Sequence, residues 1–418
     1  MPATVDTEAD NLLLRLMLMP EGRRDPYPLY RQLRQRAPVL RSGLGPIVLS
    51  RYDDCMAALR DPRLGRGTAL RRDGKLPPMA FAGMDADPDR RQAFFEIAGD
   101  NMLFADPPDH TRLRRLASRA FTPQRVEALR PAVRRMVDEV LGEMADARHV
   151  DVMAVLAFPL PVRVIGELVG VPPGDRAQFQ PLVRAAAAGI EPAATPEVLD
   201  QAAAALEAMG TYFSDLLAAR RRQPADDLLT GLVQARDAGD ALSDDEVAAT
   251  AILLFSAGFE TTTNLIGNGL LALLRHPAEM ERWRRHPTLA PSGVEELLRW
   301  DSPVQVNMRT ALEEAELAGE ALAPGDSVLV LQGGANRDPD RFVDPERFDV
   351  GRDDNVPVSF GWGIHHCLGA SLARMEGQEV FSALLARFST IDLADPDPPW
   401  RPNLTLRGLA ELKVEVAA

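Results

Sequence analysis

The sequence predicts a mainly α-helical protein with a small β portion near both ends of the chain. The stretch from Thr111 to about Trp300 has the character of consecutive helices separated by proline-containing breaks. Short strand-forming segments occur before residue 60 and return after Ser302. Helices and strands do not alternate along the chain, which argues against a doubly wound sheet.

Composition excludes several classes of protein. The chain has 418 residues, of which 46% are hydrophobic, and this is enough to bury a large core. Its formal net charge of -14 disfavours general binding to nucleic acid or to anionic membrane surfaces. It has two cysteines, Cys55 and Cys367, which excludes a disulfide scaffold.

Residues 1–24 are predicted to form an N-terminal segment that packs on a single domain of residues 25–418. The apolar stretch Leu12–Met19 is interrupted by Arg15 and is too short to span a bilayer. Acidic residues precede it, whereas a signal peptide begins with basic residues. We therefore expect a soluble, cytoplasmic protein that contacts neither a membrane nor nucleic acid.

The elements of the first quarter of the chain are short. A helix is expected over Tyr27–Gln35, and two strands over Pro38–Leu40 and Ile47–Ser50 flank a glycine-rich turn. A second short helix is expected over Asp53–Arg60. Residues 61–108 are rich in Gly, Pro and Asp, and are predicted to form a long functional loop.

Strands and turns return in the last quarter. Ala311–Leu317 and Ser327–Leu331 are expected to be strands, and residues 336–369 a turn-rich meander. A helix follows from about Gly369 to Arg387. Leu404–Val416 is expected to form short strands.

The longest predicted helix covers Val247–Leu274. Ser243 and Glu246 form a capping-box pattern before it, and the dipeptide at His276 ends it. Its 28 residues contain one charge, and at 1.5 Å per residue they span ~42 Å, about the width of a large domain. We interpret it as a helix through the centre of the domain rather than as a membrane span.

The middle of this helix is polar, which a buried helix does not need for stability. Glu260 is its single charge, and an unpaired buried carboxylate costs several kcal/mol. Gly258 and the three threonines 261–263 also weaken the helix. The segment is therefore a candidate site.

A second candidate site is the loop Phe360–Gly369, in which three glycines alternate with aromatic, His and Cys residues. Glycines permit positive φ and close backbone approach, so several N–H groups can point at the sulfur of Cys367. Those N–H groups, with a helix that starts just after the cysteine, would stabilise a thiolate, which is a soft metal ligand.

Three interpretations of this loop compete. The first is a structural loop with a buried thiol. The second is a zinc site of Cys367 with His365 or His366, although structural zinc sites use four ligands, usually in closely spaced pairs that this chain lacks. The third is a single axial thiolate ligand to haem iron.

The loop resembles the haem-ligand signature of the cytochrome P450 family, Phe-Gly-x-Gly-x-His-x-Cys-x-Gly, at every fixed position. Ala257–Thr262 resembles the family's oxygen-activating segment, and Glu296–Arg299 its Glu-x-x-Arg motif. Asn336–Pro339 and Pro345–Phe348 resemble the stretch before the cysteine loop. The resemblance runs from about Asp25 to Val416 and is closest to the soluble bacterial branch.

The resemblance implies the cytochrome P450 fold, with the long central helix over haem b (iron protoporphyrin IX) and Cys367 as the metal ligand. It implies a buried structural triad of Glu296, Arg299 and Arg347. His366 lies outside the pattern and is expected to pack or to face the proximal surface. The cofactor-binding residues that it implies are His110, Arg114, Ala257, Gly258, Arg309, Phe360, Gly361, His365, Cys367 and Gly369.

The function implied is that of a haem-thiolate monooxygenase in bacterial secondary metabolism, which hydroxylates or epoxidises a small organic substrate with O2. Thr261 and Glu260 are the implied catalytic residues, which organise water for proton delivery. Alternatives are a family member that catalyses oxidative coupling or ring formation, and a non-catalytic haem-binding protein. Parts of 81–103 and 177–190 are expected to line the substrate pocket, together with Leu253, Ala257, Val304, Gln305, Thr405 and Leu406.

The implied electron donor is a ferredoxin or flavodoxin-type protein with its NAD(P)H reductase. Arg112–Arg135 contains eight arginines and one glutamate, a basic segment in an acidic chain. It is either a solvated helical face or a docking surface for an acidic donor.

Overall fold

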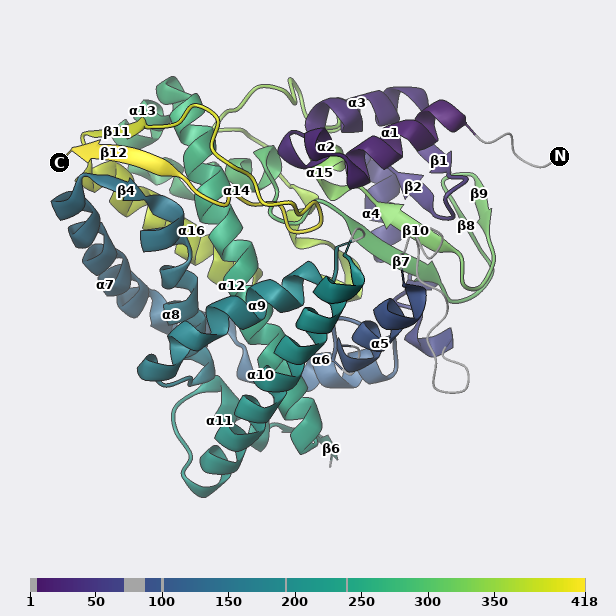
Figure 1. Ribbon diagram of the computed structural model, residues 1–418, viewed down its shortest axis with the longest axis horizontal. Coiled ribbons are helices and arrows are strands. Elements are labelled where there is room, and N and C mark those ends of the chain that lie inside the picture. The colour runs from purple at the N-terminus through teal and green to yellow at the C-terminus, as the bar shows by residue number, and fades with distance from the viewer. Residues whose placement is uncertain (1–5, 71–86, 99–100, 192–193, 238–239, 418) are drawn as a thin grey trace.

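Helices fill most of the molecule, and most strands lie towards its two ends, with the β5-β6 hairpin apart from them (Figure 1). The computed structural model describes residues 6–70, 87–98, 101–191, 194–237 and 240–417. The mainly helical class with a small β portion is confirmed.

The helices before the long central one range in length from five residues to 27. They are α1 (Thr7–Leu18), α2 (Pro20–Arg24), α3 (Tyr27–Arg36), α4 (Tyr52–Arg60), α5 (Pro88–Ala98), α6 (Asp109–Ala120), α7 (Pro123–Ala147), α8 (Pro159–Val169), α9 (Phe179–Ala188), α10 (Pro196–Arg222) and α11 (Leu228–Gln234). The central helix and those after it are α12 (Asp244–Arg275), α13 (Pro277–Arg285), α14 (Ala290–Trp300), α15 (Gln332–Ala335) and α16 (Ala370–Arg387).

A five-stranded sheet pairs strands from the first quarter of the chain with strands from its last third, in the order β1-β2-β10-β7-β3. Its strands are β1 (Val39–Arg41), β2 (Ile47–Leu49), β3 (Leu64–Gly65), β7 (Asn307–Ala311) and β10 (Ser327–Val330). β10 pairs in parallel with β2, with Val328 opposite Ile47, and antiparallel with β7.

Smaller sheets complete the β portion. A three-stranded sheet has the order β11-β12-β4, and two hairpins pair β5 with β6 and β8 with β9. Their bounds are β4 (His149–Asp151), β5 (Arg236–Asp237), β6 (Asp240–Ala241), β8 (Ala315–Leu317), β9 (Glu320–Leu322), β11 (Thr390–Leu393) and β12 (Lys413–Ala417).

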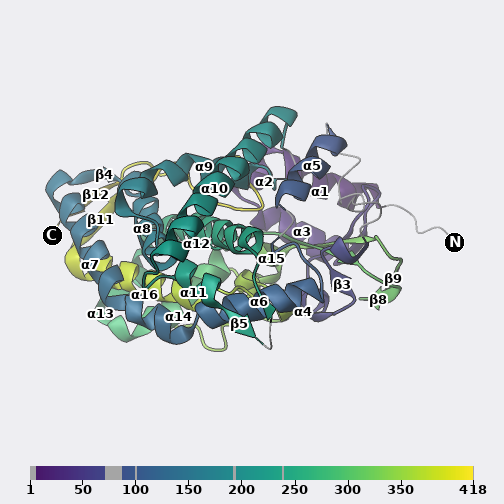
Figure 2. The same cartoon turned by 90° about the horizontal axis from the view of Figure 1, so that it is seen from below.

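The long helix α12 crosses the centre of the molecule, as the sequence predicts. The capping box is formed: Ser243 accepts from the backbone N–H of Glu246, whose carboxylate accepts from the N–H of Ser243. Figure 2 shows α9 and α10 on one side of α12, and α6, α14 and α16 on the other. The helix is buried along most of its length, which accounts for its apolar sequence.

Helix α1 packs against α3 and the five-stranded sheet. Leu13 and Leu16 of α1 are fully buried in a cluster with Leu33 of α3 and Leu329 of β10. Within the described ranges, no helix combines the length and the apolarity needed to cross a membrane.

Three predicted elements differ from the structure. The predicted loop 61–108 contains β3 and the helix α5, which forms because Phe94 and Phe95 pack against α10; residues 71–86 and 99–100 of that loop lie outside the described residues. The strand expected over Ala311–Leu317 is split between β7 and β8 by a turn. In Leu404–Val416 the described strand is β12, and the remainder forms isolated bridges from Leu406 and Leu409.

The predicted buried triad holds for two of its members and is wrong for the third. The carboxylate of Glu296 accepts two hydrogen bonds from Arg299 (2.7 and 2.8 Å), and both side chains are fully buried. The second cation on Glu296 is Arg352, at 3.2 Å, not Arg347. Arg347 is exposed and pairs with Asp349, and it contributes its backbone carbonyl to Arg299. A turn at 349–352 carries Arg352 back to Glu296, which motif spacing alone does not reveal.

Candidate active site

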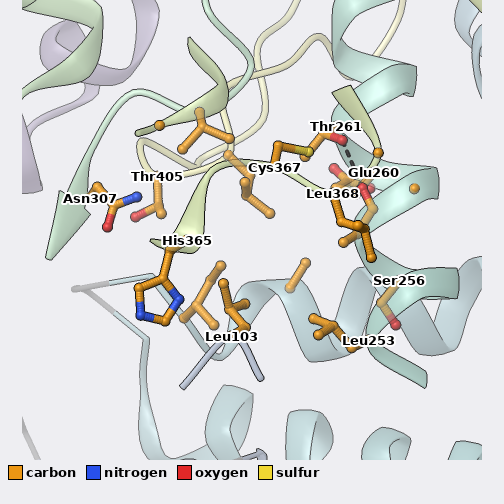
Figure 3. A pocket seen from close by; sticks show the side chains of 18 of the residues that line it. Leu103, Leu253, Ser256, Glu260, Thr261, Asn307, His365, Cys367, Leu368 and Thr405 are labelled. Atoms are coloured by element: carbon orange, nitrogen blue, oxygen red, sulfur yellow. Dashed lines mark hydrogen bonds between the residues drawn. The ribbon is translucent and has the colours of Figure 1, made fainter. Parts of the chain in front are cut away.

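A cavity of about 500 Å³ lies between α12 and the cysteine loop (Figure 3). The cysteine loop contributes Phe360, Gly361, His365, Cys367, Leu368 and Gly369 to its lining. Helix α12 contributes Leu253, Ser256, Ala257, Gly258, Glu260 and Thr261. The two candidate sites that the sequence singles out, more than 100 residues apart in the chain, are therefore parts of one site.

The cysteine loop is folded by its glycines. Gly361 and Gly363 have φ of 64° and 71°, the left-handed region that glycine alone adopts without strain. A Cβ on Gly363 would also lie 2.3 Å from the carbonyl oxygen of Leu59. The N–H of Cys367 donates to the carbonyl of Phe360 at 2.9 Å, which closes the loop directly before α16.

The thiol of Cys367 opens onto the cavity but lies deep below the outer surface of the protein. Burial raises its pKa, and the N–H of Gly369 and the charges of Arg114 and Arg374 oppose this only in part. The predicted N–H stabilisation is therefore present but outweighed by desolvation. A bound metal ion would supply the missing positive charge and hold the sulfur as a thiolate.

Arginine and histidine side chains gather at one end of the cavity, where Arg66, Arg114 and His365 line it. The rings of His110 and His365 lie 4.3 Å apart between centroids, close to Arg66, Arg114 and Arg309. Burial, and then the charges of Arg66 and Arg309, lowers the pKa of His365 far below its usual range. Burial followed by Arg114 lowers the pKa of His110 in the same way.

Several of these groups lack hydrogen-bond partners among the residues that the structure describes. They are both ring nitrogens of His110, Nε2 of His365 and Nε of Arg66. Buried polar groups are normally satisfied, so this end of the cavity suits a ligand with anionic oxygens. The two carboxylates of a haem b molecule have that chemistry.

The cavity therefore fits haem on three counts. A thiol faces it from one side, the small Ala257 lines the other, where Gly258 lets Ile165 pack close to α12, and unpaired donors lie at one end. Arg114 also donates to the carbonyl of His366 at 2.7 Å, which ties α6 to the cysteine loop. His366 packs near Trp362, at 5.8 Å between ring centroids.

Thr261 presents its hydroxyl to the cavity. Its Oγ1 donates to the carbonyl of Ala257 at 2.7 Å, one turn earlier in α12 (Figure 3). Because that bond uses the hydroxyl proton, the oxygen lone pairs remain available to accept from a group in the cavity.

Glu260 is buried but not unpaired, contrary to the premise drawn from the sequence. Its side chain is 2% exposed, and Oε1 accepts a hydrogen bond from Arg401. Its Oε2 has no partner within the described part of the chain. Arg401 and Arg184 both stack on the ring of Phe158, 4.9 and 3.8 Å from its centroid. Arg401 is 141 residues away in sequence, so no local pattern reveals this pair.

Most residues predicted to surround the cofactor and the substrate line this cavity. Of the cofactor set, His110 and Arg309 do not line it; they are buried behind His365 and beside Asn307. Of the substrate set, Gln305 is the exception. It is fully buried and bonded to Tyr27, Tyr30 and Ser302, so the expectation that it lines the pocket is wrong. The remaining five are Leu253, Ala257, Val304, Thr405 and Leu406.

Some of the other lining residues were predicted from the sequence only as parts of regions, and the rest were not predicted. The regions 81–103 and 177–190 contribute Arg91, Phe94, Phe95, Ala98, Asn101, Met102, Leu103, Val183, Ala186, Ala187 and Ile190. Glu376 of α16 was not foreseen: it is buried, and its pKa lies far above the usual range because of desolvation. Nothing nearby in the sequence distinguishes this glutamate from a surface residue.

The basic segment on α6 and α7 is less positive than its sequence implies. Arg112 pairs with Glu246 of α12, and Arg130 and Arg134 pair with Glu379 of α16. Arg115 and Arg119 lie on the exposed face of α6. Three of its eight arginines are thus paired with glutamates of other helices.

The zinc interpretation finds no ligand set in the described ranges. They contain no group of three or more His, Cys, Asp or Glu side chains placed to hold a metal ion.

Comparisons with known proteins give a consistent result. The family model of cytochrome P450 matches residues 199–286 and 288–414. Cytochrome P450 107B1 of Saccharopolyspora erythraea is 42% identical over 380 residues, which cover 90% of this chain and 91% of that protein. The 6-deoxyerythronolide B hydroxylase of the same organism is 40% identical, covering 94% and 96%. The solved structure of the polyketide synthase cytochrome P450 PksS of Bacillus subtilis has a TM-score of 0.84 at 38% identity, covering 95% of this chain and 98% of that one.

Proposed function

The chain belongs to the cytochrome P450 family, and from this we propose that it is a haem-thiolate monooxygenase of bacterial secondary metabolism that binds haem b in the cavity between α12 and the cysteine loop. The enzyme inserts one oxygen atom of O2 into an organic substrate and reduces the other to water. The observation that carries the proposal is that a thiol and a proton-handling hydroxyl, Cys367 and Thr261, face one cavity.

Haem supplies the oxidising chemistry when it is bound. Cys367 would hold its iron through the thiolate, which would donate electron density to the metal. The guanidinium groups of Arg66 and Arg114 and the ring of His365, which line the cavity, would bind the two propionates, with His110 and Arg309 buried beside them. The side of the cavity that holds the sulfur is formed in part by Gly361, Gly369 and the ring of Phe360.

On the wall of the cavity formed by α12, Thr261 and Glu260 hold and transfer protons. The hydroxyl of Thr261 is held by Ala257 and accepts a hydrogen bond at Oγ1, which fixes a water or an oxygen atom beside the reacting centre. The unpartnered Oε2 of Glu260 accepts a proton from water and passes it on, while Arg401 holds Oε1. These two groups give protons a defined route along the α12 wall of the cavity.

The substrate is a small, largely apolar organic molecule that is hydroxylated or epoxidised. The wall contributed by Phe94, Phe95, Leu103, Ile190 and Leu206 is apolar, and Ser256 and Thr405 offer isolated hydrogen bonds. A relative named for hydroxylation of 6-deoxyerythronolide B supports a substrate of this kind.

Electrons come from a ferredoxin or flavodoxin-type donor with its NAD(P)H reductase. Arg115 and Arg119 on the exposed face of α6, beside the cysteine loop, favour an acidic partner. We assign the enzyme to the cytoplasm, where its two cysteines, both free, remain reduced.

Turnover in labelled oxygen tests the proposal. The holoenzyme, with a surrogate ferredoxin and reductase, is incubated under ¹⁸O2 with a panel of apolar macrolactones and fatty acids. We expect one labelled oxygen atom per product molecule and substrate-dependent NADPH consumption. A haem protein that consumes no electrons with any substrate, or whose product takes oxygen only from water, contradicts the proposal.

A further inference from the structure

A buried carboxylate outside the catalytic machinery joins separate segments of one cavity wall. Glu191 follows the end of α9 and is 7% exposed. Its Oε2 accepts hydrogen bonds from the backbone N–H groups of Leu404 (3.0 Å) and Thr405 (3.1 Å), and its Oε1 accepts one from Leu406 (3.2 Å). One side chain thus satisfies three consecutive N–H groups of the C-terminal turn.

The backbone beside Glu191 is fixed by a third segment. Arg91 of α5 is 5% exposed, and its guanidinium donates to the carbonyl oxygens of Glu191 (3.1 Å) and Gly189 (3.5 Å). A Cβ on Gly189 would lie 2.7 Å from Phe94 of α5 and 2.7 Å from Ala202 of α10. The close packing at Gly189 and the polar contacts at Glu191 therefore connect α5, the end of α9 and the turn at 404–406.

These three segments form one wall of the cavity. Arg91 and Phe94 of α5, Ile190 beside Glu191, and Thr405 and Leu406 of the turn all line it. In Figure 2, α5 lies with α9 and α10 on the side of α12 that is opposite to α16, the helix that follows Cys367. The wall thus faces the substrate space rather than the sulfur.

We propose that Glu191 is a positioning residue that ties α5, the end of α9 and the 404–406 turn into one wall and so limits the size of the molecules that reach the cavity. The inference rests on the proposed function, because it assumes that the cavity receives an organic ligand. Glu191 does not line the cavity and acts through Ile190, Thr405 and Leu406.

The chemistry of the contact explains why a carboxylate is needed. Three N–H donors converge on two oxygens, both of which only accept. In Glu191→Gln the amide oxygen still accepts from one side, but its NH2 group opposes an N–H donor on the other. In Glu191→Ala all three N–H groups lose their acceptor, and the turn separates from α9.

Hydrogen–deuterium exchange of the purified holoenzyme directly measures how firmly Glu191 holds the 404–406 turn. We expect the amides of 404–406 to exchange about tenfold faster in Glu191→Ala and by an intermediate factor in Glu191→Gln, because local opening releases them. The cysteine-loop peptide should exchange as in the parent. Glu207→Ala, an exposed glutamate of α10, is the matched control and should change neither peptide.

Azole binding, followed by the shift of the haem absorption band in stopped flow, measures access by size. We expect Glu191→Ala to raise the association rate constant of the bulky azole clotrimazole about fivefold and that of imidazole less than twofold, since only the large ligand needs the wall to open. Parent-like exchange at 404–406 in Glu191→Gln or Glu191→Ala, or equal acceleration of both azoles, would overturn the proposal.

The two hypotheses fail differently. A parent protein that shows no haem band and no azole-induced shift contradicts the proposed function. The exchange comparison at 404–406 would still test whether Glu191 holds that turn. If Glu191→Ala does not fold, Glu191→Gln decides it alone.

Discussion

At the scale of single residues, adjacent positions in α12 have different environments. The hydroxyl of Thr261 faces the cavity and is held by the carbonyl of Ala257, whereas the carboxylate of Glu260 is buried against Arg401. In the proposed function, the first contacts the reacting molecule and the second exchanges protons with water in the cavity.

Replacing Thr261 by Ala should separate oxygen consumption from product formation. Without the acceptor at Oγ1, protons reach the reacting oxygen in a disordered way, and oxygen leaves as hydrogen peroxide. We expect product per NADPH to fall about tenfold or more, within the range typical of a lost proton-transfer group, while haem content is retained. Thr261→Ser keeps the hydroxyl and should recover most of the coupling. Full coupling in Thr261→Ala would place the proton relay elsewhere.

Replacing Arg401 by Met should destabilise the protein strongly. The substitution leaves the carboxylate of Glu260 buried without its cation, and we expect the free energy of unfolding to fall by about 4 kcal/mol. Urea unfolding of the holoenzyme measures it. Adding Glu260→Gln removes the stranded charge, so the double variant should be more stable than Arg401→Met alone. Additive losses from the two substitutions would show that the pair is not coupled.

At the scale of elements, the structure was predictable where the signal is local. The capping box at Ser243 and the apolar run after it locate α12 to within a few residues, and the glycines around Cys367 identify its loop. Helix α5 was missed because its polar sequence becomes helical only when Phe94 and Phe95 pack against α10. The pairs Glu260–Arg401 and Glu296–Arg352 were missed because they join residues far apart in the chain.

The assignment of Arg352 to the buried network predicts a difference between two nearby arginines. Arg352→Ala removes two hydrogen bonds from a fully buried carboxylate, and its side chain is 10% exposed against 64% for Arg347. We expect it to lower the free energy of unfolding by about 1.5–3 kcal/mol, and Arg347→Ala by less than about 0.5 kcal/mol. Thermal or urea unfolding compares the two. A larger loss from Arg347→Ala than from Arg352→Ala would show that Arg347, not Arg352, stabilises the buried carboxylate of Glu296.

Helix α6 is the element predicted to meet the electron donor. Charge reversal by Arg115→Glu with Arg119→Glu should slow reduction by an acidic ferredoxin at low salt and leave azole binding unchanged. The difference should shrink at high salt, since the Debye length falls from ~8 Å at physiological ionic strength to ~3 Å at 1 M. Arg31→Glu with Arg36→Glu on α3, away from α6 in Figure 1, gives the same change of net charge as a control. Equal effects of the two pairs, or none from the α6 pair, would remove α6 from the docking surface.

At the scale of the whole molecule, the cavity exists because distant parts of the chain close around α12. The five-stranded sheet pairs β2 from the first fifty residues with β10, and the turn at 404–406 reaches α9 through Glu191. On the other side, α6 and α16 bring Arg114 and Cys367 together. The outcome is a cavity with a thiol on one side, a hydroxyl on another and unpaired donors at one end. No single motif specifies that combination, although two motifs locate it.

The central claim is that Cys367 ligates haem iron as a thiolate in this cavity, and the absorption spectrum of the reduced protein under carbon monoxide tests it most directly. We predict the long-wavelength Soret band that marks thiolate ligation in the parent and in Cys55→Ser, whose buried cysteine lies outside the cavity lining. Cys367→Ser should lose that band and bind haem weakly. A parent without the band, or a Cys367→Ser variant that keeps it, would contradict the account.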